Sequence, residues 1–142
     1  MRPVTVEGEG IGWVSVEIER QIEALLFVAD GPVSLDELVP TDHVCRVIEA
    51  FATQLDLAGL GFSKAEPAAT GRPAYDPADL LKLYLYGYLH QVRSSRRLER
   101  ECQRNVEVMW LLGRLAPDHK TIAEFRRCEG RALRAACAAF VR

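Results

Sequence analysis

Residues 75–89 carry the sequence feature that most constrains the fold. Asp76 is a good helix cap, and Pro77 suits the first position of a helix. Tyr75 and Leu80 have the spacing of a hydrophobic staple across that start. From Leu80 onward the segment is apolar on nearly every side. Because such a helix has to be covered by other elements, the sequence predicts a central, buried helix.

Two capping boxes predict further helix starts. Ser34 is followed three residues later by Glu37, and Thr121 is followed by Glu124 at the same spacing. The first box opens a short helix. The second opens a final helix that we expect to run to the end of the chain.

Apolar residues at helical spacing predict two helices in the N-terminal half. One begins near Ser15 and ends at residues 30–32, where aspartate, glycine and proline follow one another. The other is capped by residues 40–42, carries an apolar stripe from Val44 to Leu55, and ends at Gly59 or Gly61. A further helix is expected to begin at Ser94 or Ser95, and Asn105 is expected to kink or break it. Because all of the predicted elements are helices, the fold class is all-α. We expect about six helices in a helix-turn-helix-like bundle, with no convincing strand.

The net charge changes sign along the chain. Residues 1–62 hold three Lys or Arg and eleven Asp or Glu, a net charge of −8. Residues 63–142 hold fifteen Lys or Arg and nine Asp or Glu, a net charge of +6. Residues 61–74 contain two glycines and two prolines and form the expected linker. The basic half is therefore expected to bind a polyanion.

The most informative patch lies between residues 91 and 104. It holds five arginines and two glutamates, and four of the arginines fall within about 60° of one another if the helix extends back to the first of them. Guanidinium groups match phosphate geometry, so a row of them can follow a nucleic-acid backbone. The alternative is a solvated face with Arg97–Glu101 and Arg96–Glu99 pairs. The expected DNA-binding residues of this patch are Arg93, Arg96, Arg97, Arg100 and Arg104.

A second basic group follows at the start of the predicted final helix. Lys120, Arg126 and Arg127 are its expected DNA contacts. Two successive helices with basic starts behind a buried helix are compatible with a helix-turn-helix arrangement. Tyr84 and Tyr88 have the spacing of a base-stacking platform, but on so apolar a helix they are more often core residues.

No catalytic, cofactor or metal site stands out in the sequence. The four cysteines and three histidines are scattered and form no Cys-x-x-Cys pair, so we interpret the cysteines as reduced structural thiols. Asp76 and Asp79 are explained by helix capping rather than by metal binding. Since the longest apolar run is seven residues and no signal peptide is recognised, we expect a cytoplasmic protein without a membrane span.

From about residue 38 onward the chain resembles the N-terminal domain of bacterial insertion-sequence transposases of the InsH type. The resemblance covers about 100 of the 142 residues in order, in segments 38–43, 46–51, 70–77, 80–88, 93–101, 105–112 and 117–126. It implies a helical domain, here residues 34–142, that helps a transposase bind the ends of its element. Residues 22–38 are similar to the opening of segregation and condensation protein B, a winged-helix protein, and residues 1–33 lie outside the transposase resemblance.

In that family, the domain precedes a catalytic domain with an Asp-Asp-Glu metal triad. The chain is expected to be truncated before it, so we expect DNA binding without strand cleavage and hence no enzyme activity of its own. An exposed apolar surface near Phe140 and Val141 is expected to promote self-association. The alternatives are a protein-interaction module that binds intact transposase or other chains, and a winged-helix segregation-type fusion.

Overall fold

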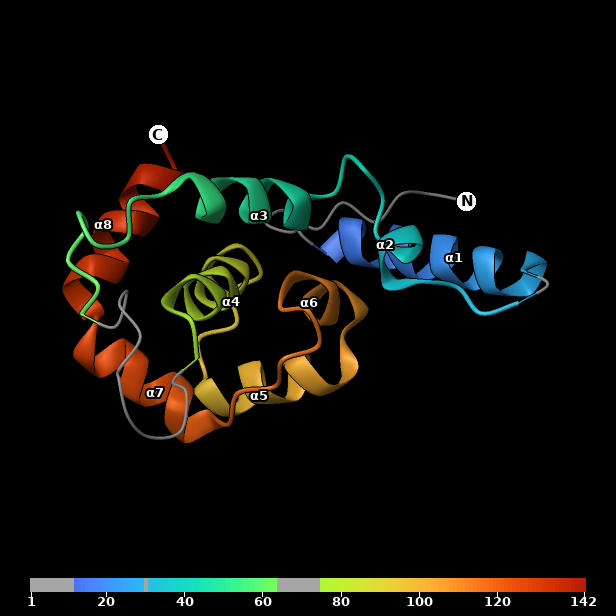
Figure 1. Ribbon diagram of the computed structural model, residues 1–142. Helices are drawn as coiled ribbons and strands as arrows, with labels where there is room; N and C mark the ends of the chain where they lie inside the picture. The colour runs from blue at the N-terminus through green and yellow to red at the C-terminus, as the bar shows by residue number, and fades with distance from the viewer. Residues whose placement is uncertain (1–11, 30, 64–74) are drawn as a thin grey trace, which may run out of the picture. The chain divides into compact units, whose positions relative to one another are not determined.

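The computed structural model describes residues 12–29, 31–63 and 75–142, and the side chains from residue 19 onward. Within these ranges the fold is all-α, with eight helices and no strand (Figure 1). The chain divides into two compact units, residues 1–40 and residues 41–142. Each unit is described by itself.

The first unit contains α1 (Gly12–Val28) and α2 (Leu35–Leu38). The capping box that the sequence predicts for α2 is confirmed. The Glu37 amide donates to Ser34 Oγ at 3.3 Å, and the Ser34 amide donates to Glu37 Oε2 at 2.8 Å. At the end of α1, Phe27 is 92% exposed and Val28 is 76% exposed. This end of the helix therefore presents apolar side chains to solvent.

In the second unit, five helices surround a central one. The central helix is α4 (Pro77–Leu89), as its apolar sequence predicts. Figure 1 shows it nearly end-on inside a ring of other helices. These are α3 (Val44–Gln54), α5 (Ser95–Arg104), α6 (Val106–Leu111), α7 (His119–Cys128) and α8 (Gly130–Phe140).

Contacts between successive helices close this ring. α3 packs against α6, α6 against α5, α5 against α7, and α7 against α8. The ring is completed by an edge-to-face contact between Phe51 of α3 and Phe140 of α8, whose centroids are 5.0 Å apart. Phe140 is thus half-buried rather than exposed, while Val141 is 63% exposed. The predicted apolar surface at this end is reduced to Val141.

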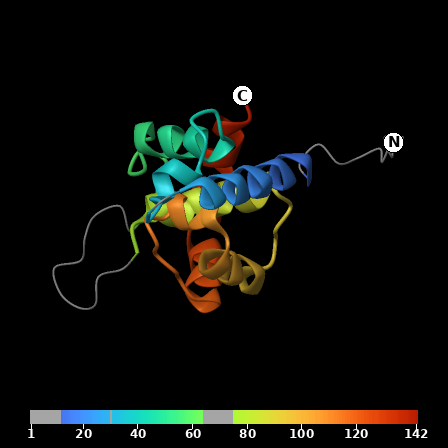
Figure 2. The same cartoon turned by 90° about the vertical axis from the view of Figure 1, so that its right-hand side faces the viewer.

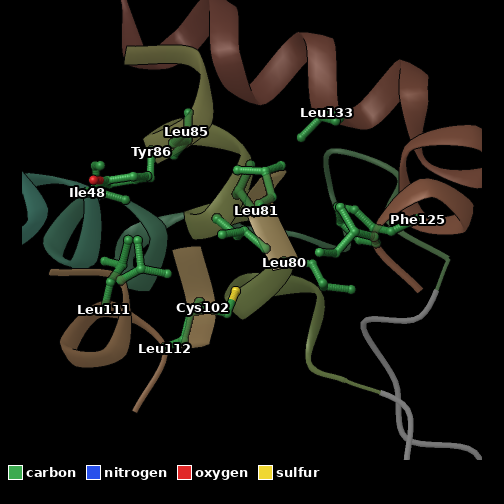
Figure 3. Packing of buried hydrophobic residues seen from close by; sticks show 14 of the residues in the cluster. Ile48, Leu80, Leu81, Leu85, Tyr86, Cys102, Leu111, Leu112, Phe125 and Leu133 are labelled. Atoms are coloured by element: carbon green, nitrogen blue, oxygen red, sulfur yellow. The ribbon is translucent and has the colours of Figure 1, made fainter. Parts of the chain in front are cut away.

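The core lies around α4. Figure 3 shows Leu81 in its middle, with Leu111 on one side and Leu133 and Phe125 on the other. Leu81 has no exposed surface. Full burial of such a side chain contributes about 1.5–3 kcal/mol, so this helix holds its neighbours chiefly through apolar contacts.

The start of α4 follows the predicted cap. Asp76 Oδ1 accepts the amide of Ala78 at 2.8 Å, and Pro77 occupies the first turn. The one charged residue among positions 80–89 is Lys82, which bonds Glu49 of α3 at 2.8 Å. Burial opposes the charge of Lys82, but hydrogen bonds and charge from Glu49 and Asp79 outweigh it and raise its pKa.

Two helix starts differ from the prediction. α3 is capped by His43, whose Nδ1 accepts the amide of Cys45 at 3.2 Å, rather than by residues 40–42. α7 is capped by Asp118, whose Oδ1 accepts the amide of Thr121 at 2.7 Å. The Thr121–Glu124 box was therefore wrong as a helix start, because the helix already begins at His119 and Thr121 is the residue being capped.

Two helix ends also differ, and the second of them adds a helix to the expected number, as the break at Asn105 does. α3 ends at Gln54, well before Gly59, since Asp56 Oδ1 accepts the Gly59 amide at 3.0 Å in the turn that follows. The predicted final helix is split at Glu129. Glu129 is 3% exposed, and its carboxylate accepts the amide of Ser63 at 3.2 Å and the Ser63 hydroxyl. Residues 64–74 of the expected linker lie outside the described residues, and both of its flanks belong to the second unit.

Candidate nucleic-acid interface

α5 is a short helix with one apolar side and a strongly basic outer side. Leu98 and Cys102 are buried against the core, and Asn105 ends the helix by accepting the Glu107 amide of α6 at 3.0 Å. The break that the sequence predicts at Asn105 is therefore confirmed. At about 100° per residue, Arg100 lies roughly opposite the buried side of α5.

The helix does not extend back to Arg93. It begins at Ser95, with Ser94 as its cap residue, so the expected alignment of four arginines on one helical face holds for three of them. The Arg93 carbonyl instead accepts a hydrogen bond from Arg126 of α7 at 3.5 Å. Arg93 thus lies beside the end of α7.

Contacts between side chains join α5 to α7. Glu99 Oε2 lies 3.0 Å from His119 Nδ1 at the start of α7, and Arg126 near its end contacts Arg93. The two helices therefore run antiparallel, and Figures 1 and 2 both show them in the same region of the unit. The two basic groups, which are about 20 residues apart in sequence, come together on adjacent helices.

We call the exposed cationic residues of this region the basic face. Every member has an exposed side chain, and the members are Arg93, Arg96, Arg97, Arg100, Arg104, Lys120, Arg126 and Arg127. The structure thus places seven of the predicted DNA-binding residues on the surface of two packed helices, and Arg93 on the surface of the turn before α5.

Some members of the basic face have acidic partners. Arg104 bonds Glu101 at 2.5 Å, and Arg127 bonds Glu124 at 3.3 Å. The pairs considered at the sequence level, Arg97–Glu101 and Arg96–Glu99, are not formed. Within the described residues, no ion pair or hydrogen bond involves the side chains of Arg96, Arg97, Arg100 and Lys120.

Glu101 remains ionised beside the basic face. Burial alone would raise its pKa, but hydrogen bonds from Asn105 and Arg104 and the charges of Arg104 and Arg97 outweigh burial and lower the pKa. One edge of the face therefore carries a carboxylate that neutralises Arg104. The unpaired cations lie elsewhere on α5 and at the start of α7.

Tyr84 and Tyr88 of α4 do not form a stacking platform. The Tyr84 hydroxyl donates to the Ile122 carbonyl at 2.6 Å, and its ring stacks on Phe125 with centroids 5.9 Å apart. Burial raises the pKa of Tyr84 to about 12. Tyr88, by contrast, is 58% exposed. The prediction of a core residue is therefore confirmed for Tyr84, which packs between α4 and α7, and wrong for Tyr88, which lies at the surface.

A buried polar network was not foreseen from the sequence. The Tyr86 hydroxyl donates to Glu107 Oε2 at 3.0 Å and accepts from Asn105 Nδ2 at 2.8 Å. Glu107 is 5% exposed. His43 and Cys45 lie beside it, so the interpretation of the histidines and cysteines as scattered does not hold for these two. The only local signal was the helix-breaking Asn105.

The cysteines otherwise agree with the sequence interpretation. All four are free thiols. Cys45 and Cys102 are buried, and burial raises the pKa of each, to about 12 for Cys102. These two thiols are therefore protonated at neutral pH when no metal ion is bound.

Comparison with known families agrees with the resemblance. Residues 33–128 match the family described as Transposase domain (DUF772). This range covers more than half of the chain, and the protein belongs to that family of transposase domains. The similarity of residues 22–38 to segregation and condensation protein B has no support from the comparison.

No curated protein and no solved structure matches the chain significantly. Among the described residues, no helix is both long and apolar enough to cross a membrane.

Proposed function

We propose that this transposase domain binds DNA through the phosphate backbone, using the basic face of α5 and α7. The observation that carries the proposal is the set of unpaired, exposed cations: Arg96, Arg97 and Arg100 on α5 and Lys120 on α7. In the insertion element, the bound DNA would be the element's ends. The proposal assigns no catalytic residue to this part of the transposase.

The chemistry of these side chains suits phosphate. Guanidinium groups offer several donors in a planar fork that fits phosphate oxygens in pairs. Arginines that already bond carboxylates would have to give up those bonds first, as Arg104 and Arg127 would. The unpaired arginines are therefore the stronger candidates for direct phosphate contacts.

A matched pair of double variants tests the proposal. Arg97→Ala with Arg100→Ala removes two unpaired cations from the basic face. Arg131→Ala with Arg134→Ala removes two exposed arginines of α8, outside the face. Both variants change the net charge equally. Binding to a labelled duplex is then measured by anisotropy at low salt, after circular dichroism has shown equal helix content.

We expect the α5 double variant to bind at least tenfold more weakly than the α8 double variant, whatever the duplex sequence, because phosphate contacts carry little base information. Equal loss in both variants would mean that only net charge matters. That result, or no loss in either, would exclude the basic face as the binding site.

A second candidate function, a protein-interaction module, is favoured by the end of α1. Leu25, Leu26, Phe27 and Val28 are all exposed there, in the acidic part of the chain. Exposed apolar side chains that follow one another are typical of contact surfaces. Leu26→Ser with Phe27→Ser should abolish concentration-dependent sedimentation if these residues join two chains. DNA binding that persists in this variant would separate the two functions.

A further inference from the structure

Three potential metal ligands meet inside the second unit, outside the basic face. They are His43 and Cys45 at the start of α3 and Glu107 in the first turn of α6. One ligand atom from each lies within 4.8 Å of the other two. His43 is 5% exposed, Cys45 is fully buried, and Glu107 is 5% exposed. Imidazole nitrogen, thiolate sulfur and carboxylate oxygen are the ligand types of zinc in proteins.

Two buried histidine ring nitrogens in this unit make no hydrogen bond. His43 Nε2 makes no hydrogen bond and has Glu107 Oε1 as its neighbour at 3.7 Å. His90 Nε2, near the end of α4, is also buried without a hydrogen bond. Because an unsatisfied buried polar atom costs free energy, each of these ring nitrogens is available to bind a ligand.

We propose that His43 Nε2, Cys45 Sγ and a Glu107 carboxylate oxygen bind a borderline-soft divalent metal ion, with Zn²⁺ as the best-fitting ion. His90 is not among the three residues whose ligand atoms lie within 4.8 Å of one another, so it can supply a fourth ligand only if its side chain moves. It connects to the cluster through Tyr86, whose ring stacks on His90 at 4.1 Å and whose hydroxyl bonds Glu107. Binding releases the Cys45 thiol proton, and the thiolate then balances part of the metal charge.

The surrounding hydrogen bonds fit a metal ligand set. The Tyr86 hydroxyl donates to the Glu107 carboxylate, as outer groups do around metal-bound carboxylates, and Asn105 Nδ2 in turn donates to the Tyr86 hydroxyl. Binding at His43 Nε2 moves the ring proton to Nδ1, which ends the hydrogen bond from the Cys45 amide. The site therefore exchanges one helix cap for a metal link between α3 and α6.

The consequence is structural and independent of DNA binding. A metal ion at this position joins residues 43–45 to residue 107, and so ties α3 to α6 on one side of α4. Metal binding to the folded state then stabilises it by mass action. The basic face lies on α5 and α7 and gains no ligand from this site.

The experiment uses the full chain after dialysis against a chelator. Co²⁺ is titrated as a spectroscopic stand-in for Zn²⁺, and its displacement by Zn²⁺ is followed. We expect one Co²⁺ per chain, a thiolate-to-cobalt charge-transfer absorption, and a higher melting temperature with Zn²⁺ than with the chelator. Unchanged spectra and an unchanged melting temperature in the wild-type chain would overturn the proposal without any variant.

Two cysteine variants locate the site. Cys45→Ser should remove the charge-transfer absorption and weaken Co²⁺ binding by at least about 100-fold, since loss of an outer group alone costs up to that much. Cys102→Ser removes a second buried thiol, on α5, and should leave both unchanged. Retention of the absorption in Cys45→Ser, or its loss in Cys102→Ser, would contradict the assignment. His90→Ala should weaken binding if His90 is the fourth ligand, and unchanged affinity would exclude His90.

Discussion

Gly87 offers a sharp test of how the structure packs α4 against the turn before α5. A Cβ atom at this position would lie 2.7 Å from the Val92 carbonyl oxygen and 3.0 Å from Leu98 Cδ2. The Val92 oxygen belongs to the backbone, and the Val92 amide also donates to the Gly87 carbonyl at 2.7 Å. Gly87→Ala thus forces a backbone segment to move by roughly half an ångström or more.

The magnitude follows from two opposing terms. Overpacking of this kind costs about 1–3 kcal/mol, whereas alanine is favoured over glycine within a helix by about 1 kcal/mol. We expect Gly87→Ala to lower the free energy of unfolding by about 1 kcal/mol net. In a unit of this size, that lowers the melting temperature by about 4 °C.

Gly130→Ala is the matched control for this prediction. The added Cβ there lies 3.7 Å from Arg134 Nη1, an ordinary van der Waals distance, and Gly130 is also helical. It should leave stability unchanged or raise it by up to about 1 kcal/mol. Urea unfolding followed by circular dichroism compares the two. If Gly87→Ala is as stable as Gly130→Ala, the close approach of α4 to residues 92–98 is wrong.

Three further predictions concern capping, pH and a single hydroxyl. Asp118→Ala should lower the melting temperature and Glu124→Ala should not, because Asp118 caps α7. Equal effects of the two substitutions would mean that the Thr121–Glu124 capping box starts the helix after all. Burial lowers the pKa of His43 and of His90, so in metal-free protein the stability is full above pH 6.5 and falls as the pH drops below it, by at most about 1.4 kcal/mol per pH unit for each histidine. A flat stability profile between pH 7 and 5.5 would refute this. Tyr84→Phe should cost about 1 kcal/mol in urea unfolding, and no cost would mean that its hydroxyl bond is not formed.

The elements with complete local signals were predicted well from the sequence. Asp76 and Pro77 predict the start of α4, and Ser34 with Glu37 predicts the start of α2. In each case one capping residue stands alone before the helix. The buried position of α4 follows from its apolar composition, because such a helix has no polar side to expose.

The predicted helix boundaries are wrong where the sequence contains two possible capping residues, or where a contact with a residue distant in sequence ends the helix. Both Asp118 and Thr121 suit a helix start, and only the first is used. Glu129 interrupts the last helix while its carboxylate binds Ser63, which is 66 residues away in sequence. Local periodicity and spacing do not predict a contact between residues so far apart in sequence.

The two candidate sites also differ in how far the sequence alone predicts them. The arginines of α5 are close together in sequence, so their clustering was visible there, although the loss of Arg93 from the helix was not. The pairing of α5 with α7 brings together residues far apart in sequence, such as Glu99 and His119. His43, Cys45 and Glu107 come from two segments more than 60 residues apart, so the cluster exists only in the folded chain.

The most direct test of the central proposal is the salt dependence of DNA binding. If four phosphates are contacted, log K against log salt should have a slope of about −3.6, which is roughly a 150-fold loss of affinity between 50 and 200 mM salt. Arg97→Ala with Arg100→Ala should make the slope shallower by about 1.8, while its melting temperature stays close to that of the parent chain. A folded double variant that keeps both the affinity and the salt slope of the parent would show that the basic face is only a solvated surface, and would contradict the proposed function.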